Sequence, residues 1–187
     1  PENWAVESYG SHPREYKKII QESRNNMAER LKKRGMAEEQ AKKIAQEHIK
    51  GTFDIGHVNM WRRFHSKDEG DFNSWLKSEI KDLVKNDIIG HVHLTDNFGY
   101  HDEHIELGEG NALVQDFMDI LKKAKFKGKL IAEPGGQKKG FSHRVWTSAL
   151  EMAGSPIYRV DAASRAWTDI EGSYFGRAQS PNFVVGD

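Results

Sequence analysis

The chain has 187 residues, enough for one domain with a sizeable core. Lysine and arginine balance aspartate and glutamate at 28 each, so no global field draws the chain towards nucleic acid or an anionic membrane. Cysteine is absent, which excludes disulfides and thiolate metal sites, and no apolar run approaches the roughly 20 residues of a membrane-spanning helix. No signal peptide is visible, and we expect a cytoplasmic protein.

The first part of the chain predicts helices. Residues 1–10 indicate the end of a strand and its loop, and Pro13 then begins an amphipathic pattern that Gly35 interrupts and a second helix continues to about residue 50. Charged and amide side chains dominate this region, which is typical of a solvated helical hairpin that covers a sheet. A lid over a site is the alternative.

Three short apolar runs predict buried strands at 52–56, 88–94 and 129–133. Amphipathic stretches at about 72–84 and 113–124 predict the helices between them, and Ser142 is suited to cap another that runs to about Met152. This alternation predicts an α/β fold with right-handed crossovers and a parallel sheet.

With a fourth strand that ends at Glu2, the chain has four βα units, which is half of a (β/α)8 TIM barrel. Half a barrel leaves two sheet edges unpaired. Closure therefore needs residues that precede Pro1 or a partner chain, and a homo-oligomer is compatible with this. We expect the barrel units over 1–153, with a helical insertion at about 13–50, and an irregular extension over 154–187.

Each predicted strand carries an ionisable residue at or near its carboxyl end. Asp54 lies near the end of the first, with His57 in the loop behind it, His93 lies near the end of the second, and Glu133 ends the third. The carboxyl ends of parallel strands form the ligand-binding face, so these side chains are expected to converge. Their repulsion and desolvation need a cation, and oxygen and imidazole ligands suit Mn²⁺, Mg²⁺, Co²⁺ or Zn²⁺.

Taken singly, each of these residues has a simpler interpretation. Asp54 is equally suited to cap the loop that follows it. His91 and His93 point to the same side of a strand, where a hydrogen-bonded core histidine is commoner than a ligand. The polar loop 95–111 is either plain surface or a functional loop after a barrel strand.

Five motifs in order resemble the xylose-isomerase-like TIM-barrel superfamily. This group holds sugar and sugar-phosphate isomerases and epimerases together with AP endonucleases of the endonuclease IV type. The resemblance implies that the chain supplies the last four βα units of the barrel. The segment from Glu2 to Asp54 is longer than is usual in the family, which suggests an extra helix over the site. The motifs are Pro1-Glu2-Asn3, Phe53-Asp54-Ile55-Gly56-His57, His91-Val92-His93-Leu94-Thr95-Asp96, Asp102-Glu103-His104 with Leu107-Gly108-Glu109-Gly110, and Ala132-Glu133.

The isomerase branch implies one divalent metal, whose ligands would be Glu2, Asp54, His93 and Glu133. Glu2 and Glu133 would also shuttle a proton through an enediolate of a small-molecule sugar or sugar phosphate. Contacts to the sugar hydroxyls would come from His57, Asp102 and His104. Trp61 could stack on the sugar and Arg62 or Arg63 could meet a phosphate, although plain loop residues are commoner at such positions.

Two alternatives stay open. The nuclease branch uses three zinc ions, recruits residues matching His57, Asp102 and His104, and acts on abasic DNA. The neutral net charge of this chain favours the sugar enzymes, so we expect no nucleic-acid partner. The other alternative is a barrel module that binds metal or sugar without turnover. The residues identify neither the sugar and its phosphorylation nor the native metal.

Overall fold

The computed structural model describes residues 1–4, 6–133, 150 and 154. The chain divides into two units, residues 1–141 and 142–187. The helix predicted from Ser142 and the extension after residue 154 lie outside the described residues and stay predictions.

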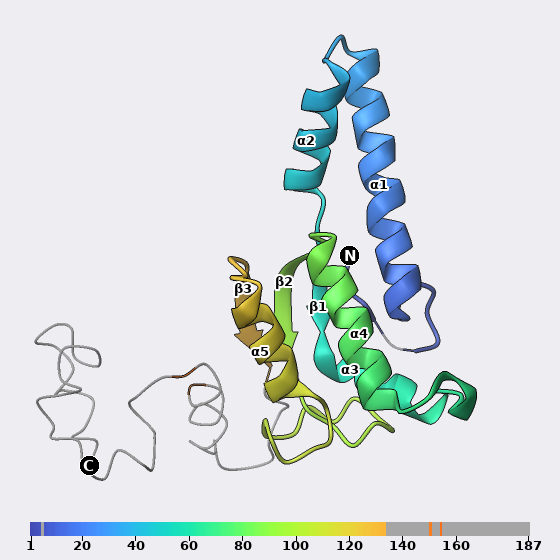
Figure 1. Cartoon of the computed structure of the whole chain (residues 1–187), viewed down its shortest axis with the longest axis vertical. Helices are drawn as coiled ribbons and strands as arrows, with labels where there is room; N and C mark the ends of the chain where they lie inside the picture. The colour runs from blue at the N-terminus through green and yellow to red at the C-terminus, as the bar shows by residue number, and fades with distance from the viewer. Residues whose placement is uncertain (5, 134–149, 151–153, 155–187) are drawn as a thin grey trace, which may run out of the picture. The chain divides into compact units, whose positions relative to one another are not determined.

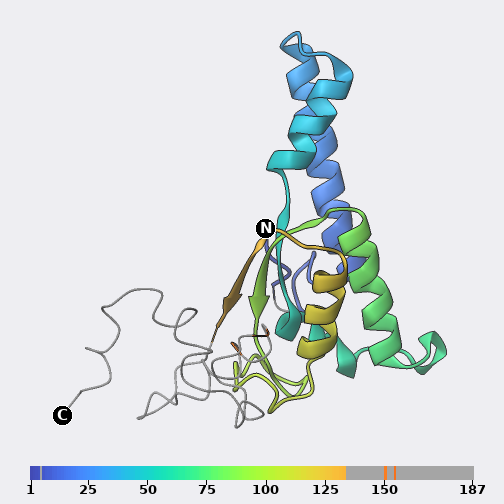
Figure 2. The ribbon, with the colours of Figure 1, turned by 60° about the vertical axis from the view of Figure 1, so that its left-hand side comes forward.

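A parallel sheet forms the centre of this unit (Figure 1). Its strands are β1 (Gly51–Asp54), β2 (Ile89–Leu94) and β3 (Lys129–Ala132), in the order β1-β2-β3. The connections between them run through α4 (Phe72–Lys85) and α5 (Val114–Lys123), which cover one face of the sheet in both views (Figures 1 and 2). The predicted α/β fold with parallel strands is confirmed.

Apolar residues at the expected spacing form the core between sheet and helices. Phe53 of β1 is fully buried and its ring lies 5.5 Å from that of Phe117 of α5, edge to face. In α4 the buried side chains recur on one face, as the sequence period predicts; they are Phe72, Trp75, Leu76, Ile80 and Leu83.

The amino-terminal residues extend the sheet beyond β1. Glu2 forms a parallel bridge with Thr52, and the Thr52 N–H donates to the Pro1 carbonyl at 2.9 Å. Because β2 occupies the other edge of β1, this pairing places Glu2 beside β1, where the fourth strand is predicted to end.

The first predicted strand ends two residues early. Asp54 caps a short helix, α3 (Ile55–Asn59), by accepting from the Gly56 and His57 N–H groups, so Ile55 and Gly56 are helical. Two 3-10 turns follow, η1 (Met60–Arg63) and η2 (Lys67–Glu69).

The helices α1 (Pro13–Lys33) and α2 (Glu38–His48) form the predicted hairpin, which turns at Gly35 with a φ of 91°. Tyr16, near the start of α1, is buried and donates its hydroxyl to the Thr52 carbonyl at 2.7 Å. Beyond Arg24, a small core of its own holds the hairpin together, made by Ala28, Ala41 and Ala45 with Met27, Leu31 and Met36.

The position of the hairpin excludes the lid. Arg24 donates to the carbonyls of Ile49, Asn86 and Asp87, which directly precede β1 and β2. The tip of the hairpin therefore lies beyond the amino ends of the strands (Figure 1), whereas the candidate site lies at their carboxyl ends. The interpretations of this segment as a lid or as an extra helix over the site are wrong. Within the described residues, no helix combines the length and apolar character needed to cross a lipid bilayer.

Candidate metal centre

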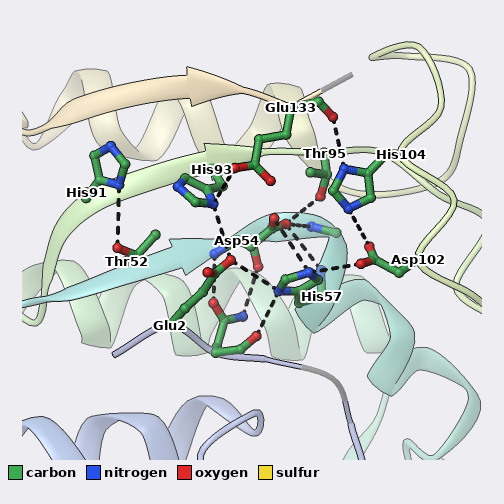
Figure 3. A network of polar contacts seen from close by, with 12 residues as sticks. Glu2, Thr52, Asp54, His57, His91, His93, Thr95, Asp102, His104 and Glu133 are labelled. Atoms are coloured by element: carbon green, nitrogen blue, oxygen red, sulfur yellow. Dashed lines mark hydrogen bonds and ion pairs between the residues drawn. The ribbon is translucent and has the colours of Figure 1, made fainter. Parts of the chain in front are cut away.

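Neighbouring strand ends bring three of the predicted ligands together (Figure 3). The register pairs Asp54 with His93, and the N–H of Glu133 continues the ladder by donating to the Leu94 carbonyl at 3.1 Å. Asp54, His93 and Glu133 each offer a ligand atom, and these atoms lie within 4.8 Å of one another.

Asp54 divides its two oxygens between two tasks. Oδ1 accepts from the N–H groups of Gly56 and His57 and from the hydroxyl of Thr95. Oδ2 is buried and has no hydrogen-bond partner among the described residues, although His57 Nε2 lies 3.9 Å from it. Burial raises the pKa of the Asp54 carboxyl above its ordinary value, against the opposing effects of His57 and Thr95. An unpartnered carboxylate oxygen in a buried place is costly unless a cation meets it.

His93 presents a second buried atom without a hydrogen-bond partner in the described part of the chain. Its Nδ1 is buried, 3.2 Å from Glu2 Oε1 and 3.0 Å from Glu133 Oε1, yet neither contact has the geometry of a hydrogen bond. The two glutamates approach the ring from opposite sides in Figure 3. Three carboxylates around one imidazole nitrogen form an oxygen and nitrogen donor set that fits a divalent cation. Glu2, Asp54, His93 and Glu133 would hold it.

Asn3 fixes the position of Glu2. Its buried side chain donates to the Asp54 carbonyl at 2.9 Å and accepts from the Asp54 N–H at 2.7 Å. The side-chain amide of Asn3 thus extends the backbone pairing that begins with the bridge between Glu2 and Thr52. The Asn3 carbonyl also lies 3.1 Å from His57 Nδ1. Sequence reasoning assigned no role to Asn3; the available signal was an amide directly beside a predicted ligand.

A second group of donors adjoins the first. Asp102 Oδ2 lies 3.2 Å from His57 Nε2, and Asp102 Oδ1 lies 3.0 Å from His104 Nε2. The Nδ1 atoms of the two rings face backbone carbonyls, that of Asn3 for His57 and that of Glu133 for His104 at 3.1 Å. Because a carbonyl only accepts, each Nδ1 carries the hydrogen and each Nε2 faces the carboxylate. Carbonyl partners of this kind also orient the imidazole ligands of metals.

The charges of this group support one another in the cation-free protein. The hydrogen bond with Asp102 raises the pKa of His104 to about 9. Burial lowers the pKa of His57, but Asp102 and Asp54 outweigh it and the net shift is upwards. Burial likewise opposes ionisation of Asp102, and the two imidazoles outweigh it and hold the pKa of that carboxyl below its usual range.

The other residues predicted to contact the substrate, Trp61, Arg62 and Arg63, contact neighbouring protein residues. The Trp61 ring is 4.9 Å from that of His12 and 5.9 Å from that of Phe64, which gives its predicted stacking on a sugar no support. Arg62 donates to Asn59, Asn73 and Asn111, and Arg63 donates to the Tyr100 carbonyl. His91 lies against Thr52 and the ring of His93, as a core histidine would.

The sequence analysis did not place Trp4 beside the site, but the structure does. Its side chain is 60% exposed and its ring lies 5.3 Å from that of His57 at an interplanar angle of 69°. An aromatic residue two positions after a predicted ligand was the signal that could have found it.

Comparison with known proteins identifies the family. The sequence model described as "Xylose isomerase-like TIM barrel" matches residues 25–153. The chain belongs to this family. Two curated relatives come from Methanocaldococcus jannaschii. Uncharacterized protein MJ1311 is 36% identical over 86 residues, which cover 45% of this chain and 24% of that protein. Uncharacterized protein MJ1614 is 34% identical over 76 residues, which cover 40% and 24%.

The matched segments span about a quarter of the length of both relatives. A similar solved structure is the crystal structure of a D-tagatose 3-epimerase-like protein, at 26% identity and a TM-score of 0.37, covering 57% of this chain and 34% of that chain.

The titration of His104 tests the second group. In protein freed of cations with EDTA, an NMR titration is expected to give a midpoint near the pKa of about 9, and Asp102→Asn should return it towards the ordinary 6.5. Since the folded pKa is raised, the pair contributes stability fully below about pH 6.5 and loses it as the pH rises through about 9. The free energy of unfolding should fall over this window more steeply in the wild type than in Asp102→Asn. A wild-type midpoint near 6.5 would contradict the geometry.

Proposed function

We propose that this site belongs to a sugar or sugar-phosphate isomerase or epimerase that uses one divalent cation. The chain would supply the last four βα units of the barrel. The observation that carries the proposal is the pair of glutamates on either side of His93 Nδ1, beside the unpartnered Oδ2 of Asp54. Two carboxylates that flank one position suit a reaction in which a proton leaves carbon and returns to it.

The two glutamates would divide the proton transfer between them. A bound divalent cation would draw electrons from the carbonyl and hydroxyl oxygens of a sugar, which acidifies the adjacent C–H bond. One carboxylate, Glu2 or Glu133, takes that proton. Return of a proton to the other face of the same carbon gives the epimer. Return to the neighbouring carbon, with a hydroxyl proton moving from one sugar oxygen to the other, gives the isomer.

The second group would hold the sugar. A hydroxyl both donates and accepts, so it could insert between an imidazole Nε2 of His57 or His104 and the Asp102 oxygen that faces it. Holding the sugar in one orientation places the reacting carbon against the glutamates, which is where a large part of the rate of such reactions originates.

Glu133→Gln tests the proton transfer. The amide keeps the shape of the side chain but cannot act as a base, so exchange of the sugar C–H with D₂O should fall at least about 100-fold. The measurement is NMR of a panel of ketoses and ketose phosphates incubated with the protein and Mn²⁺. Glu109→Gln, an exposed glutamate of the loop 95–111, is the matched control and should leave exchange unchanged. Exchange at the wild-type rate in a folded, cation-loaded Glu133→Gln variant would remove Glu133 from the role of base.

A zinc-dependent endonuclease for abasic DNA is the second candidate. The observation in its favour is that Asp102, His57 and His104 also form a donor group within 4.8 Å, with both imidazoles held by backbone carbonyls. Further cations there would activate water for attack on a phosphodiester. Against it, residues 95–111 include no lysine or arginine and five acidic residues, whereas phosphate backbones are bound by basic side chains.

Counting the bound cations separates the candidates. After dialysis against Zn²⁺ and removal of excess metal, the isomerase predicts one equivalent per chain, unchanged by Asp102→Asn. Three equivalents, with loss on Asp102→Asn and cleavage of an abasic-site duplex, would instead support the nuclease. One bound cation with neither proton exchange nor cleavage would indicate a binding module without turnover.

A further inference from the structure

Asp96 is a buried carboxylate that the proposed chemistry does not use. It follows the end of β2 by two residues, and 1% of its surface is exposed. Among the ion pairs of the described residues, none involves Asp96. Its two oxygens instead accept from four backbone N–H groups at 2.8–3.1 Å, those of Asn97, Gly108, Gly110 and Ala112.

These four donors come from both ends of one loop, residues 97–112. One side chain therefore closes the loop on itself, and backbone contacts agree with this. The Ile105 N–H donates to the Asp96 carbonyl, and the Asn111 N–H donates to the Asn97 carbonyl, both at 2.9 Å. The segment between these contacts carries Asp102 and His104.

The same contact explains why residue 110 in Leu107-Gly108-Glu109-Gly110 is a glycine. A Cβ at Gly110 would collide with Asp96 Oδ1 and with the Asn97 carbonyl, so only glycine lets this backbone approach the carboxylate. Hydrogen bonds to an ionised carboxylate are stronger than neutral ones. An asparagine at 96 would turn an N–H₂ group towards some of these N–H donors and leave them unpaired.

We propose that Asp96 is a positioning residue, whose carboxylate holds loop 97–112 closed and thereby sets Asp102 and His104 against His57. That Asp102 and His104 contact a sugar rests on the proposed function. The closure of the loop does not.

The test compares three variants with the wild type in the cation-free full chain. Asp96→Asn removes the charge, and Gly110→Ala disturbs the same contact through the backbone. Asp119→Asn changes an exposed carboxylate of α5 and is the matched control. Two NMR readouts apply: hydrogen exchange of the Gly108, Gly110 and Ala112 amides, and the ring resonances of His57 and His104, whose centroids lie 6.3 Å apart.

In Asp96→Asn the three amides should exchange at least about tenfold faster, and the ring contact between His57 and His104 should be lost. The amides of α4 should keep their protection, and Asp119→Asn should resemble the wild type. Unchanged amide exchange or a retained ring contact in Asp96→Asn would overturn the proposal. So would global unfolding of both Asp96→Asn and Gly110→Ala, because Asp96 would then support the whole fold rather than the loop.

Kinetics supply the readout that a merely structural role would not move. On a sugar that the wild type turns over, Asp96→Asn should raise KM about tenfold with a smaller effect on kcat. The double variant Asp96→Asn with Asp102→Asn should have the same kcat/KM as Asp102→Asn alone. Additive losses would overturn the proposal. If no sugar is turned over, the proposed function fails while the NMR readouts still decide the role of Asp96.

Discussion

The half-satisfied carboxylate of Asp54 is the constraint on which the rest of the site depends. One oxygen is held by two backbone N–H groups and a hydroxyl, so the side chain cannot rotate away from its position. The other oxygen is therefore fixed in a buried place where no described residue donates a hydrogen bond to it, and the buried Nδ1 of His93 likewise has no hydrogen-bond partner there. Such an arrangement is costly in a protein without a cation, and it is the arrangement that a cation stabilises.

The surrounding structure holds these atoms in place from several directions. Asn3 attaches the amino-terminal residues, and with them Glu2, to the backbone of Asp54. The carbonyls of Asn3 and Glu133 orient the two imidazoles that share Asp102. The two groups are therefore linked, because the residue that fixes Glu2 also accepts from His57, and Glu133 does the same for His104. A substitution in one group is therefore expected to shift the side chains of the other.

The sequence predicts the architecture well because burial leaves a periodic pattern. The spacing of Trp75, Leu76 and Ile80 defines the inner face of α4, and short apolar runs between polar residues mark β1 and β2. The convergence of Asp54, His93 and Glu133 at one edge also follows from parallel strands. The predicted strand end at Gly56 was wrong, because the side chain of Asp54 caps a helix there, which is the capping role that the sequence offered as the simpler interpretation.

Other parts of the site depend on contacts that no local pattern encodes. Asn3 meets a backbone 51 residues away, and Asp96 meets N–H groups up to 16 residues along the chain. Both roles require the register and the loop path to be known first. The exposed Trp4 and the packed Trp61 show the same limit, since these two tryptophans near the predicted ligands differ only in what the fold places beside them.

Locating a soaked cation tests the central claim most directly. Crystals of the protein soaked in Zn²⁺ should give an anomalous peak at about 2.0–2.2 Å from Asp54 Oδ2 and His93 Nδ1, with a carboxylate oxygen of Glu2 and of Glu133 completing the coordination. Diffraction data that place no ion between these four side chains, at saturating Zn²⁺, would contradict the account.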